Sequence, residues 1–488
     1  MGSVDGLVTG MSTSSTVAQL MQVEALPQTA LKNKVAVQNK AVTGLQAING
    51  KMSALVTAAK ALSEPGSWTG MKATSSSDAA VVTALPGAAA GSFSFKVESL
   101  ASTHTATFTG ATVSSAKDAL LAPAISGSTF DIRLADGSMK TLTPTDASLS
   151  SVAAAINGDA DSMFKASAVQ VAPGQFTLQL TAKTSGAAAA FSDENDPAKL
   201  LADAVSGLTL GTPTLTNAGA DAQLKVGTTA DAYTITSATN TFAEVQPGVT
   251  VTATKKQDVA DAPVTISLET DAEALATKVS TMVEAANVAL TEIATQTRGK
   301  SGNTAAGALA GDSALRQLSQ QILSTVAGGS STMGSFHAVG VAVDRYGKIT
   351  FDKDAFTKSY TADPAKTQAY FDSYTEKPHA KANATKFDVG WDKAEGIANK
   401  LLEVGTLAST GAKLPTDLPT KVVQGTVQGL IKRRNDSIES LNDQVAAWDV
   451  RLDLRKSALE RQFSNLEVAM GKMQQQSSWL AGQLAGLG

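Results

Sequence analysis

A seven-residue repeat in the last part of the chain constrains its fold more than any other feature. Nine apolar residues follow one another at intervals of seven without a gap: Ile431, Ile438, Val445, Leu452, Leu459, Leu466, Met473, Leu480 and Leu487. This spacing keeps apolar side chains on one side of an α-helix, forming the seam along which helices pack. Leu441 and Trp448 follow repeat positions by three residues. The sequence therefore predicts one long helix with a continuous packing seam.

A segment near the start of the chain has the pattern of a partner helix. Residues 31–59 contain no Pro, and their apolar residues fall on the same three-four spacing. A lone seam cannot bury itself in water, so we expect the two helices to pair as a discontinuous coiled-coil stalk. The predicted intramolecular seam consists of Leu31, Val35, Val42, Leu45, Met52, Ile431, Ile438, Leu441, Val445, Trp448 and Leu452.

The middle of the chain has the pattern of β-structure. Between residues 71 and 269 the composition shifts to Ala, Thr, Ser, Val and Gly, with alternating stretches such as GSFSFKVESLA at 91–101. Such alternation is typical of half-buried strands. One helix is expected at residues 148–159, and the helical period returns after Asp271, a plausible N-cap. This order predicts an α+β multidomain protein with a helical body and inserted β-rich head domains.

We expect four parts in a chain of 488 residues. Residues 1–35 and 460–488 are predicted to form charge-poor terminal docking helices, and residues 36–70 and 270–459 the helical body and coiled-coil stalk. Residues 71–109 and 220–269 are predicted to form the first β-rich head domain. Residues 110–219 are predicted to form the second, inserted β-rich head domain.

The two ends of the chain carry almost no charge. Only Lys472 is charged among residues 468–488, and residues 1–31 carry only Asp5 and Glu24. Two such marginal ends do not make a stable pair in water, so we expect other subunits to bury them and the last residues to be unfolded before assembly. An ordinary intramolecular core helix is the better interpretation for residues 431–452 only. The predicted subunit or filament docking residues are Leu7, Met11, Leu20, Met21, Phe463, Leu466, Met470, Met473, Trp479, Leu480, Leu484 and Leu487.

Composition excludes several classes of function. The net charge of −4 gives no electrostatic footprint for nucleic acid. The absence of Cys excludes disulfides, thiolate metal sites and Cys nucleophiles. The sequence has neither a run of about 20 apolar residues, which a membrane span needs, nor the pattern of a signal peptide. We therefore expect no membrane span and, if the chain is exported, a route that reads another signal.

Motifs for catalysis or metal binding are weak. RGKSGN at 298–303 contains Gly-Lys-Ser, but Ala294 stands where a phosphate-binding loop needs its first Gly, so a turn between helices explains it. Asp159 and Asp161 have a calcium-like spacing without the remaining ligands, which favours a solvated turn. The acidic stretch at 192–199 is better explained as a helix start. Three histidines lack ligand spacing: His104, His337 and His379. We expect no enzyme activity, catalytic residue, metal or cofactor.

Seven stretches, in order along the chain, resemble the bacterial flagellar filament cap protein family, also called flagellar hook-associated protein 2. The first is GLVTGMSTSSTVAQLMQVEALPQTAL at 6–31, where Ser12 replaces an Asp common in the family. The others lie at 91–101, 237–254, 282–293, 309–318, 339–356 and 451–484. The last stretch includes the sequence Ser478-Trp479-Leu480 near its end. Residues 110–219 carry little that is diagnostic.

The resemblance implies a structural protein, exported by the flagellar type III apparatus, at the distal tip of the filament. Such proteins form a homo-oligomeric ring, commonly a pentamer although other counts occur in the family, which promotes flagellin folding and insertion and prevents flagellin loss. The implied partners are the chain itself, flagellin, hook-associated proteins and an export chaperone at the C-terminal segment. The alternative is a surface adhesin whose β-rich heads bind a host glycan or protein, although the Ala- and Thr-rich strands name no ligand.

Overall fold

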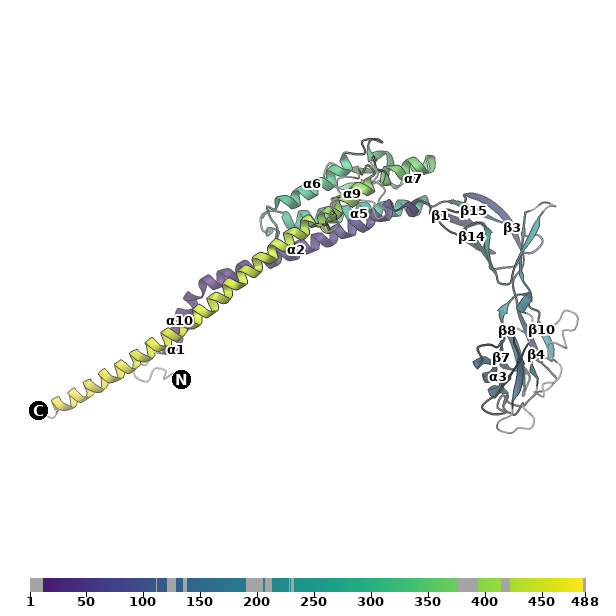
Figure 1. Ribbon diagram of the computed structural model, residues 1–488, viewed down its shortest axis with the longest axis horizontal. Coiled ribbons are helices and arrows are strands. Elements are labelled where there is room, and N and C mark those ends of the chain that lie inside the picture. Colours follow the sequence, from purple (N-terminus) through teal and green to yellow (C-terminus); the bar gives the residue numbers. More distant parts are fainter. Residues whose placement is uncertain are drawn as a thin grey trace. The chain divides into compact units, whose positions relative to one another are not determined.

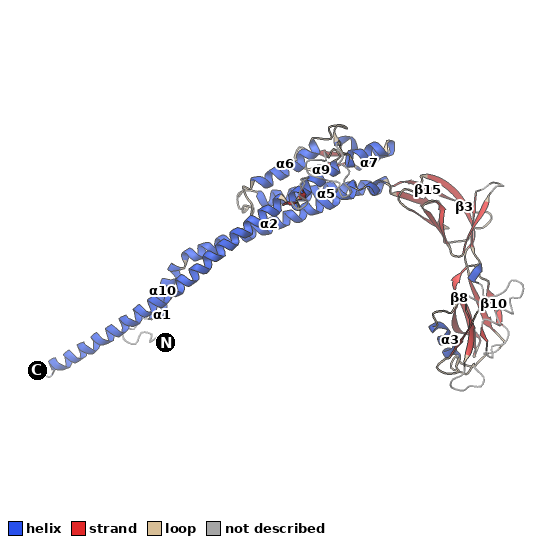
Figure 2. Cartoon of the chain, in the orientation of Figure 1, coloured by secondary structure: helices blue, strands red, loops and turns tan. Residues whose placement is uncertain are grey.

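The computed structural model describes residues 12–110, 112–120, 129–134, 138–189, 205–206, 213–227, 229, 232–375, 394–413 and 422–485. The chain divides into two compact units: residues 1–68 with 272–488, and residues 69–271. The first unit is mainly helical and the second mainly strands (Figure 2). The predicted α+β multidomain class, with a long C-terminal helix, is confirmed.

The first unit is built on two long helices, α2 (Leu26–Ser63) and α10 (Thr426–Ala485). α1 (Thr13–Glu24) precedes α2. The remaining helices are α5 (Ala272–Thr297), α6 (Ser313–Ala327), α7 (Lys353–Ala362), α8 (Pro364–Asp372) and α9 (Ile397–Ser409). The short elements are the 3-10 helices η1 (Pro65–Trp68) and η3 (Phe336–Val339), and the strand pairs β16 (Val341–Val343) with β17 (Ile349–Phe351) and β18 (Ala412–Lys413) with β19 (Val422–Val423).

The core of the helical unit lies where α2 packs against α5 and α9. Leu55 and Ile48 on α2 are fully buried there. An aromatic cluster closes one end of this core, with the Trp68 and Phe371 ring centroids 5.3 Å apart. Gly405 lets α9 approach α2 closely, because a Cβ at that position would lie 2.7 Å from Cγ2 of Val56. The body is therefore packed around the N-terminal helix.

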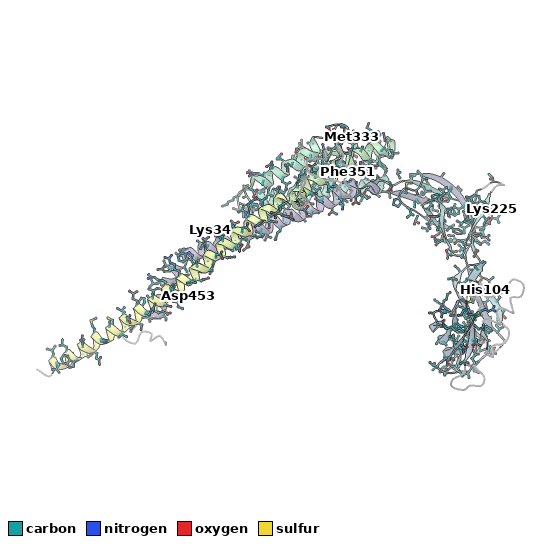
Figure 3. All side chains as sticks on the ribbon, viewed as in Figure 1. Lys34, His104, Lys225, Met333, Phe351 and Asp453 are labelled. Atoms are coloured by element: carbon teal, nitrogen blue, oxygen red, sulfur yellow. The ribbon has the colours of Figure 1, made fainter. Side chains whose placement is uncertain are left out.

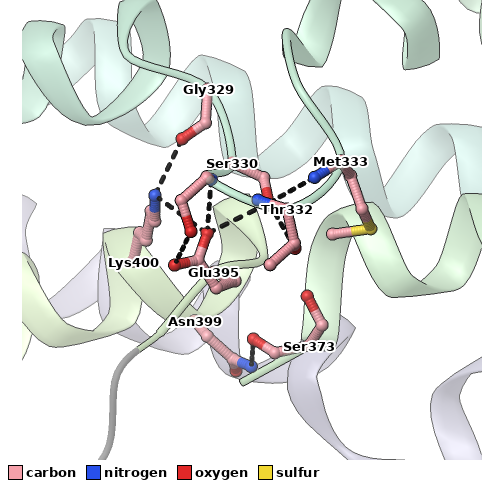
Figure 4. Close-up of polar contacts among 9 residues, drawn as sticks. Gly329, Ser330, Thr332, Met333, Ser373, Glu395, Asn399 and Lys400 are labelled. Atoms are coloured by element: carbon pink, nitrogen blue, oxygen red, sulfur yellow. Dashed lines mark hydrogen bonds and ion pairs between the residues drawn. The ribbon is translucent and has the colours of Figure 1, made fainter. Parts of the chain in front are cut away.

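A buried carboxylate holds the start of α9 to the loop after α6 (Figure 4). Glu395 is 8% exposed. Its oxygens accept hydrogen bonds from Ser330 Oγ at 3.0 Å, Ser331 N at 2.7 Å and Ser331 Oγ at 2.6 Å. The Lys400 ammonium lies 3.8 Å from the carboxylate and donates to the Gly329 carbonyl. Burial raises the pKa of Glu395, but the serine hydrogen bonds and Lys400 outweigh it and hold the pKa below its usual range.

The second unit holds two sets of antiparallel strands. The first set forms a sheet in the order β1 (Met71–Ser75), β15 (Val264–Thr270), β3 (Gly91–Ser99), β11 (Ala222–Val226) and β12 (Tyr233–Ser237). A second sheet has the order β13 (Thr241–Gln246), β14 (Val249–Ala253) and β2 (Ala80–Ala84). Phe95, Leu224 and Val251 are fully buried in the core that these two sheets share.

The other set surrounds a separate core. One sheet has the order β10 (Pro213–Asn217), β4 (Thr103–Phe108), β8 (Gln175–Ser185) and β7 (Phe164–Ala172), and another the order β6 (Met139–Leu142), β5 (Phe130–Arg133) and β9 (Val205–Ser206). The 3-10 helix η2 (Ala187–Ala189) follows β8, and α3 (Leu149–Gly158) lies at the predicted helix position with Ser148 as N-cap. Because β4 contributes to this core and β10 pairs with β4, we propose that the inserted head domain begins near Ser102, before the predicted start at residue 110, and ends near Gly219.

The acidic pair with calcium-like spacing binds a lysine. The Lys140 ammonium lies 2.8 Å from the Asp159 carboxylate and 2.7 Å from that of Asp161. The hydrogen bond from Lys140 holds the pKa of Asp159 below its usual range. The acidic stretch at 192–199 and His379 lie outside the described residues.

His104 is buried at the base of the inserted strands. It is 1% exposed, and the Gly219 backbone N–H donates to its Nδ1 at 3.3 Å. Gly219 has no space for a side chain, since a Cβ would lie 2.8 Å from the Gly186 carbonyl oxygen. Burial lowers the pKa of His104, so the folded state favours the neutral imidazole that accepts this hydrogen bond.

Replacing Glu395 by Gln is expected to destabilise the helical unit by about 1–3 kcal/mol at pH 7, because charge-assisted hydrogen bonds are lost and Lys400 loses its counter-ion. Glu395 has a lowered pKa, so its contribution is present above pH 4.5 and is lost as the pH falls through the folded-state value. Urea unfolding followed by helical circular dichroism measures this. The exposed Glu439→Gln is the matched control, and equal stability of E395Q and the native chain at pH 7 would contradict the assignment.

The second unit should lose stability as the pH falls from 7 to 5.5. The unfolded state binds a proton at His104 near pH 6.5, whereas burial lowers the pKa of this residue in the folded state. The contribution of His104 to the free energy of unfolding is therefore complete above pH 6.5 and declines below it. Amide exchange of β4 and β8 in the full chain, corrected for intrinsic rates, measures the loss. His104→Asn should weaken the pH dependence, and the exposed His337→Asn should leave it unchanged. A pH dependence that persists in H104N would rule out His104 as its source.

Candidate docking surface

α10 runs antiparallel to α2 and α1 along most of its length (Figure 1). Three polar contacts mark this direction, because the residue numbers rise on α10 as they fall on its partner. The contacts are Arg434 Nη1 to Gln38 Oε1 at 3.0 Å, Gln28 Nε2 to the Val445 carbonyl at 3.4 Å, and Arg455 Nε to Glu24 Oε1 at 3.2 Å. The N-terminal helices therefore cover one side of α10 as far as its middle turns.

The predicted seam residues fall into two groups. Leu45 and Met52 are fully buried, but in the core of the helical body, where α2 meets α5 and α9. The others are half-buried, Ile431 also packing against the core of the body. Those along the antiparallel pair are Leu31, Val35, Val42, Ile438, Leu441, Val445, Trp448 and Leu452. Half burial is what a two-helix pair provides, since each helix covers only one side of the other.

Gln28 is a polar residue inside this pair that the seven-residue repeat does not predict. It is 5% exposed and donates to both the Asp449 carboxylate and the Val445 carbonyl. The signal that could have found it is its position three residues before Leu31, on the seam spacing. A buried polar residue in a seam fixes the register of the pair, because any slip leaves it without partners.

α1 covers α10 loosely. Its N-cap Ser12 accepts from the Ser15 backbone N–H at 3.3 Å. Val17 is the only buried residue of α1, while Leu20 is 42% exposed and Met21 is half-buried. The predicted docking residues Leu7, Met11 and Leu487 lie outside the described residues.

A groove of about 270 Å³ lies beside α1, where α1, the first turn of α2 and α10 meet. Its lining is mostly apolar and carries the Glu24–Arg455 ion pair. The Arg451 guanidinium lies 4.7 Å from the centre of the Trp448 ring. The lining residues are Leu20, Val23, Glu24, Pro27, Trp448, Arg455 and Leu459.

α10 extends beyond the helix that covers it. We call residues 468–485 the overhang. Glu467, just before it, is the last α10 residue that is buried, whereas every residue from Lys472 to Ala485 is exposed. The large apolar side chains of the overhang are exposed as follows: Val468 57%, Met470 39%, Met473 61%, Trp479 65%, Leu480 56% and Leu484 65%. Figure 3 shows the side chains beyond Asp453 extending from a helix that stands alone at its end.

The overhang continues the seam of α10. Leu466, at 50% exposure, Met470, Met473, Leu480 and Leu484 are separated by three, four or seven residues and so share one side of the helix. Phe463, half-buried, begins this series. Trp479 lies about 100° around the helix from Leu480. A partner that covers both must therefore contact more than one side of the overhang.

The overhang is helical, as the seven-residue repeat and the docking helix expected at residues 460–488 predicted, although we expected the last residues to be unfolded before assembly. α10 continues to Ala485 without a break. Extending an existing helix adds a hydrogen bond for each residue without a new nucleation cost, and Met, Gln, Leu and Ala all favour helix. The expectation of unfolded last residues considered only the missing tertiary contacts and gave this continuity too little weight.

The described residues offer little for other chemistry. Within them, no three His, Asp or Glu side chains gather closely enough to hold a metal ion. None of the helices in the described ranges is both long and apolar enough to cross a membrane. The most distinctive surface is thus the exposed apolar face of α1 and the overhang.

Comparison with known proteins assigns most of the chain to the family that the sequence resembles. The family profile of the flagellar hook-associated protein 2 C-terminus matches residues 219–475, and that of its N-terminus matches residues 9–104. The flagellar hook-associated protein 2 of Salmonella typhimurium is 27% identical over 357 residues, which is 70% of this chain and 68% of that protein. The lateral flagellar hook-associated protein 2 of Vibrio parahaemolyticus is 29% identical over 151 residues, 31% of this chain and only 34% of the relative.

The fold is also shared with a solved structure. The crystal structure of the D1-D2-D3 domains of the Escherichia coli flagellar cap protein FliD superposes with a TM-score of 0.53 at 22% identity. The match covers 80% of this chain and 99% of the other. At this identity the likeness concerns the fold alone, and the sequence profiles carry the assignment. The chain belongs to the flagellar hook-associated protein 2 family.

Proposed function

We propose that this chain is a structural subunit of the cap at the distal tip of the bacterial flagellar filament. Family membership supports the flagellar role, and the E. coli protein of the same fold is a flagellar cap protein. In this role copies of the chain form a ring, for which we propose five copies. The ring promotes flagellin folding and insertion and prevents flagellin loss. The proposal includes no catalytic step.

One observation carries the docking mechanism: the overhang exposes six large apolar side chains and carries one charge, that of Lys472. Burying one Leu or Met contributes about 2 kcal/mol. That gain offsets the entropy lost in ordering the helix only if most of the six become buried together. The overhang is therefore suited to an apolar groove between helices of another subunit.

Flagellin and hook-associated subunits are the proposed partners of this surface. The partner helix contacts the seam side through Leu466, Met473 and Leu480, and a second helix covers Trp479. The groove beside Trp448 accepts a single large apolar side chain from the same partner. Before export, the same exposed residues would be covered by a chaperone, because an uncovered apolar helix promotes aggregation.

The comparisons give no support to the alternative of a surface adhesin. The family and the E. coli structure concern the flagellar cap, and none of the comparisons bears on ligand binding by the β-rich heads.

Changing Leu480 and Leu484 together to Asp should abolish capping, because two carboxylates would have to enter an apolar groove. Cells that depend on the variant should release flagellin into the medium at roughly ten times the native level or more, as a loss of at least about 1.4 kcal/mol implies. Deletion of residues 479–488 should act in the same way. Immunoblots of culture medium and electron microscopy of filaments measure the effect.

The matched control for this test is Ser478→Asp with Ala485→Asp, which adds the same charge to the same helix on the side away from the seam. The control should cap nearly normally. Unchanged thermal unfolding of each purified variant would show that the body is intact. Normal filament growth with L480D/L484D, or equal loss with the control, would contradict docking through the seam.

Amide hydrogen exchange of the isolated chain should be fast in α1 and the overhang and slow in α10 residues 430–450. Helical hydrogen bonds without tertiary packing open readily, so the overhang should exchange orders of magnitude faster. The same amides should become protected once the cap is assembled on filaments. Strong protection of the overhang in a monomer would instead indicate an intramolecular bundle.

A further inference from the structure

Two methionines lie within the seam of the overhang. Met470 and Met473 occupy positions that the same seam otherwise fills with leucine, as at Leu466 and Leu480. Met is flexible and adapts to different apolar surfaces, which suits a helix that meets more than one partner. Its thioether sulfur is also the one group in this seam that oxidants can attack.

The exposure of the methionines differs sharply along the chain. Met473 is 61% exposed and Met470 39% exposed, whereas Met52 and Met282 in the helical body are fully buried. Exposure to solvent decides how fast an oxidant reaches the sulfur. The two seam methionines are therefore accessible, and the core methionines are shielded by the body. Met139, 46% exposed in the second unit, provides an internal standard away from the overhang.

We propose that Met470 and Met473 form an oxidation site that switches the docking surface off. This proposal rests on the proposed function, because it assumes that the overhang must be buried by a partner. The oxidant is a hydroperoxide such as hydrogen peroxide, which an exported subunit meets outside the cell. Once assembled, the same two sulfurs are covered, so the free subunit is the sensitive form.

The chemistry is a two-electron oxygen transfer. The thioether sulfur donates an electron pair to one oxygen of hydrogen peroxide, so a sulfur–oxygen bond forms while the oxygen–oxygen bond breaks. The proton on the attacked oxygen passes to the displaced hydroxide, which leaves as water. The sulfur is oxidised to a sulfoxide and the peroxide is reduced. No residue of the chain has to act as acid or base, and methionine sulfoxide reductase with a thiol reductant reverses the product.

Oxidation changes the seam from apolar to polar at two adjacent turns. Each sulfoxide oxygen is a strong hydrogen-bond acceptor. The seam side chains Leu466, Leu480 and Leu484 offer no donor, and the nearest donors on this side are Gln474 and Ser477, each four residues after one of the methionines, so a sulfoxide that bonds to neither is buried without a donor. Burial of an acceptor without a donor is unfavourable, by enough to weaken docking roughly tenfold for each sulfoxide. Lys472 lies on a different side of the helix, so its ammonium does not face the seam.

The test uses the full-length chain treated with limiting hydrogen peroxide. Peptide mass spectrometry should find Met470 and Met473 oxidised at a rate comparable with Met139 and far ahead of Met52 and Met282. The treated protein, added to cells that secrete flagellin but lack this chain, should retain flagellin at least about tenfold less well. Treatment with methionine sulfoxide reductase should restore retention.

The matched variant is Met470→Leu with Met473→Leu, which keeps apolar volume and helix preference and removes both sulfurs. It should cap normally before and after peroxide. Met139→Leu, the control, should remain sensitive. Equal loss of capping after peroxide in M470L/M473L and the native chain would show that oxidation at another residue causes the loss, which contradicts the proposal. Full capping by a chain with both sulfoxides would also overturn it.

Failure of the proposed function itself gives a different result. If the overhang does not dock, L480D/L484D caps normally without any oxidant, and the oxidation experiment loses its premise. If docking is correct and only the switch is wrong, L480D/L484D fails to cap while the doubly oxidised native chain still caps.

Discussion

The antiparallel packing of α10 on α2 is the interaction on which the rest of the helical unit depends. α2 contributes both to this pair and to the core of the body, where it packs against α5 and α9. The 60 residues of α10 are more than this arrangement can cover. The register, held by Gln28 and by the Arg434–Gln38 contact, decides where the coverage stops. The overhang exists because α10 extends beyond the helices that pack against it.

The difference between the covered and uncovered parts of α10 links stability to function. The same seam is half-buried near Ile438 and Val445, where α2 supplies the partner, and exposed at Met473 and Leu480, where the described chain supplies none. A protein that buried the whole seam internally would gain stability but would have no apolar surface left for other subunits. The groove beside Trp448 and the methionines of the seam lie on the part that is left available.

Much of this architecture follows from the sequence because regular patterns specify regular elements. The seven-residue repeat predicts α10, the alternating stretches predict the strands of the second unit, and Ser148 marks the start of α3. Tertiary choices follow less directly. The repeat cannot tell that Leu45 and Met52 turn toward the body, since a seam residue looks the same whichever helix it meets. The repeat predicts the helicity of the overhang, whereas the expectation that its last residues are unfolded before assembly gave too little weight to continuity with α10.

The central claim is that the overhang is free in the isolated subunit and buried in the cap. Since the chain contains no Cys, Leu480→Cys introduces a single thiol whose labelling rate reports on that position alone. The claim predicts fast labelling in the free chain and labelling at least about tenfold slower when the cap is on the filament, as expected for a buried thiol. Equal rates in the two states, or slow labelling in the free chain, would contradict it.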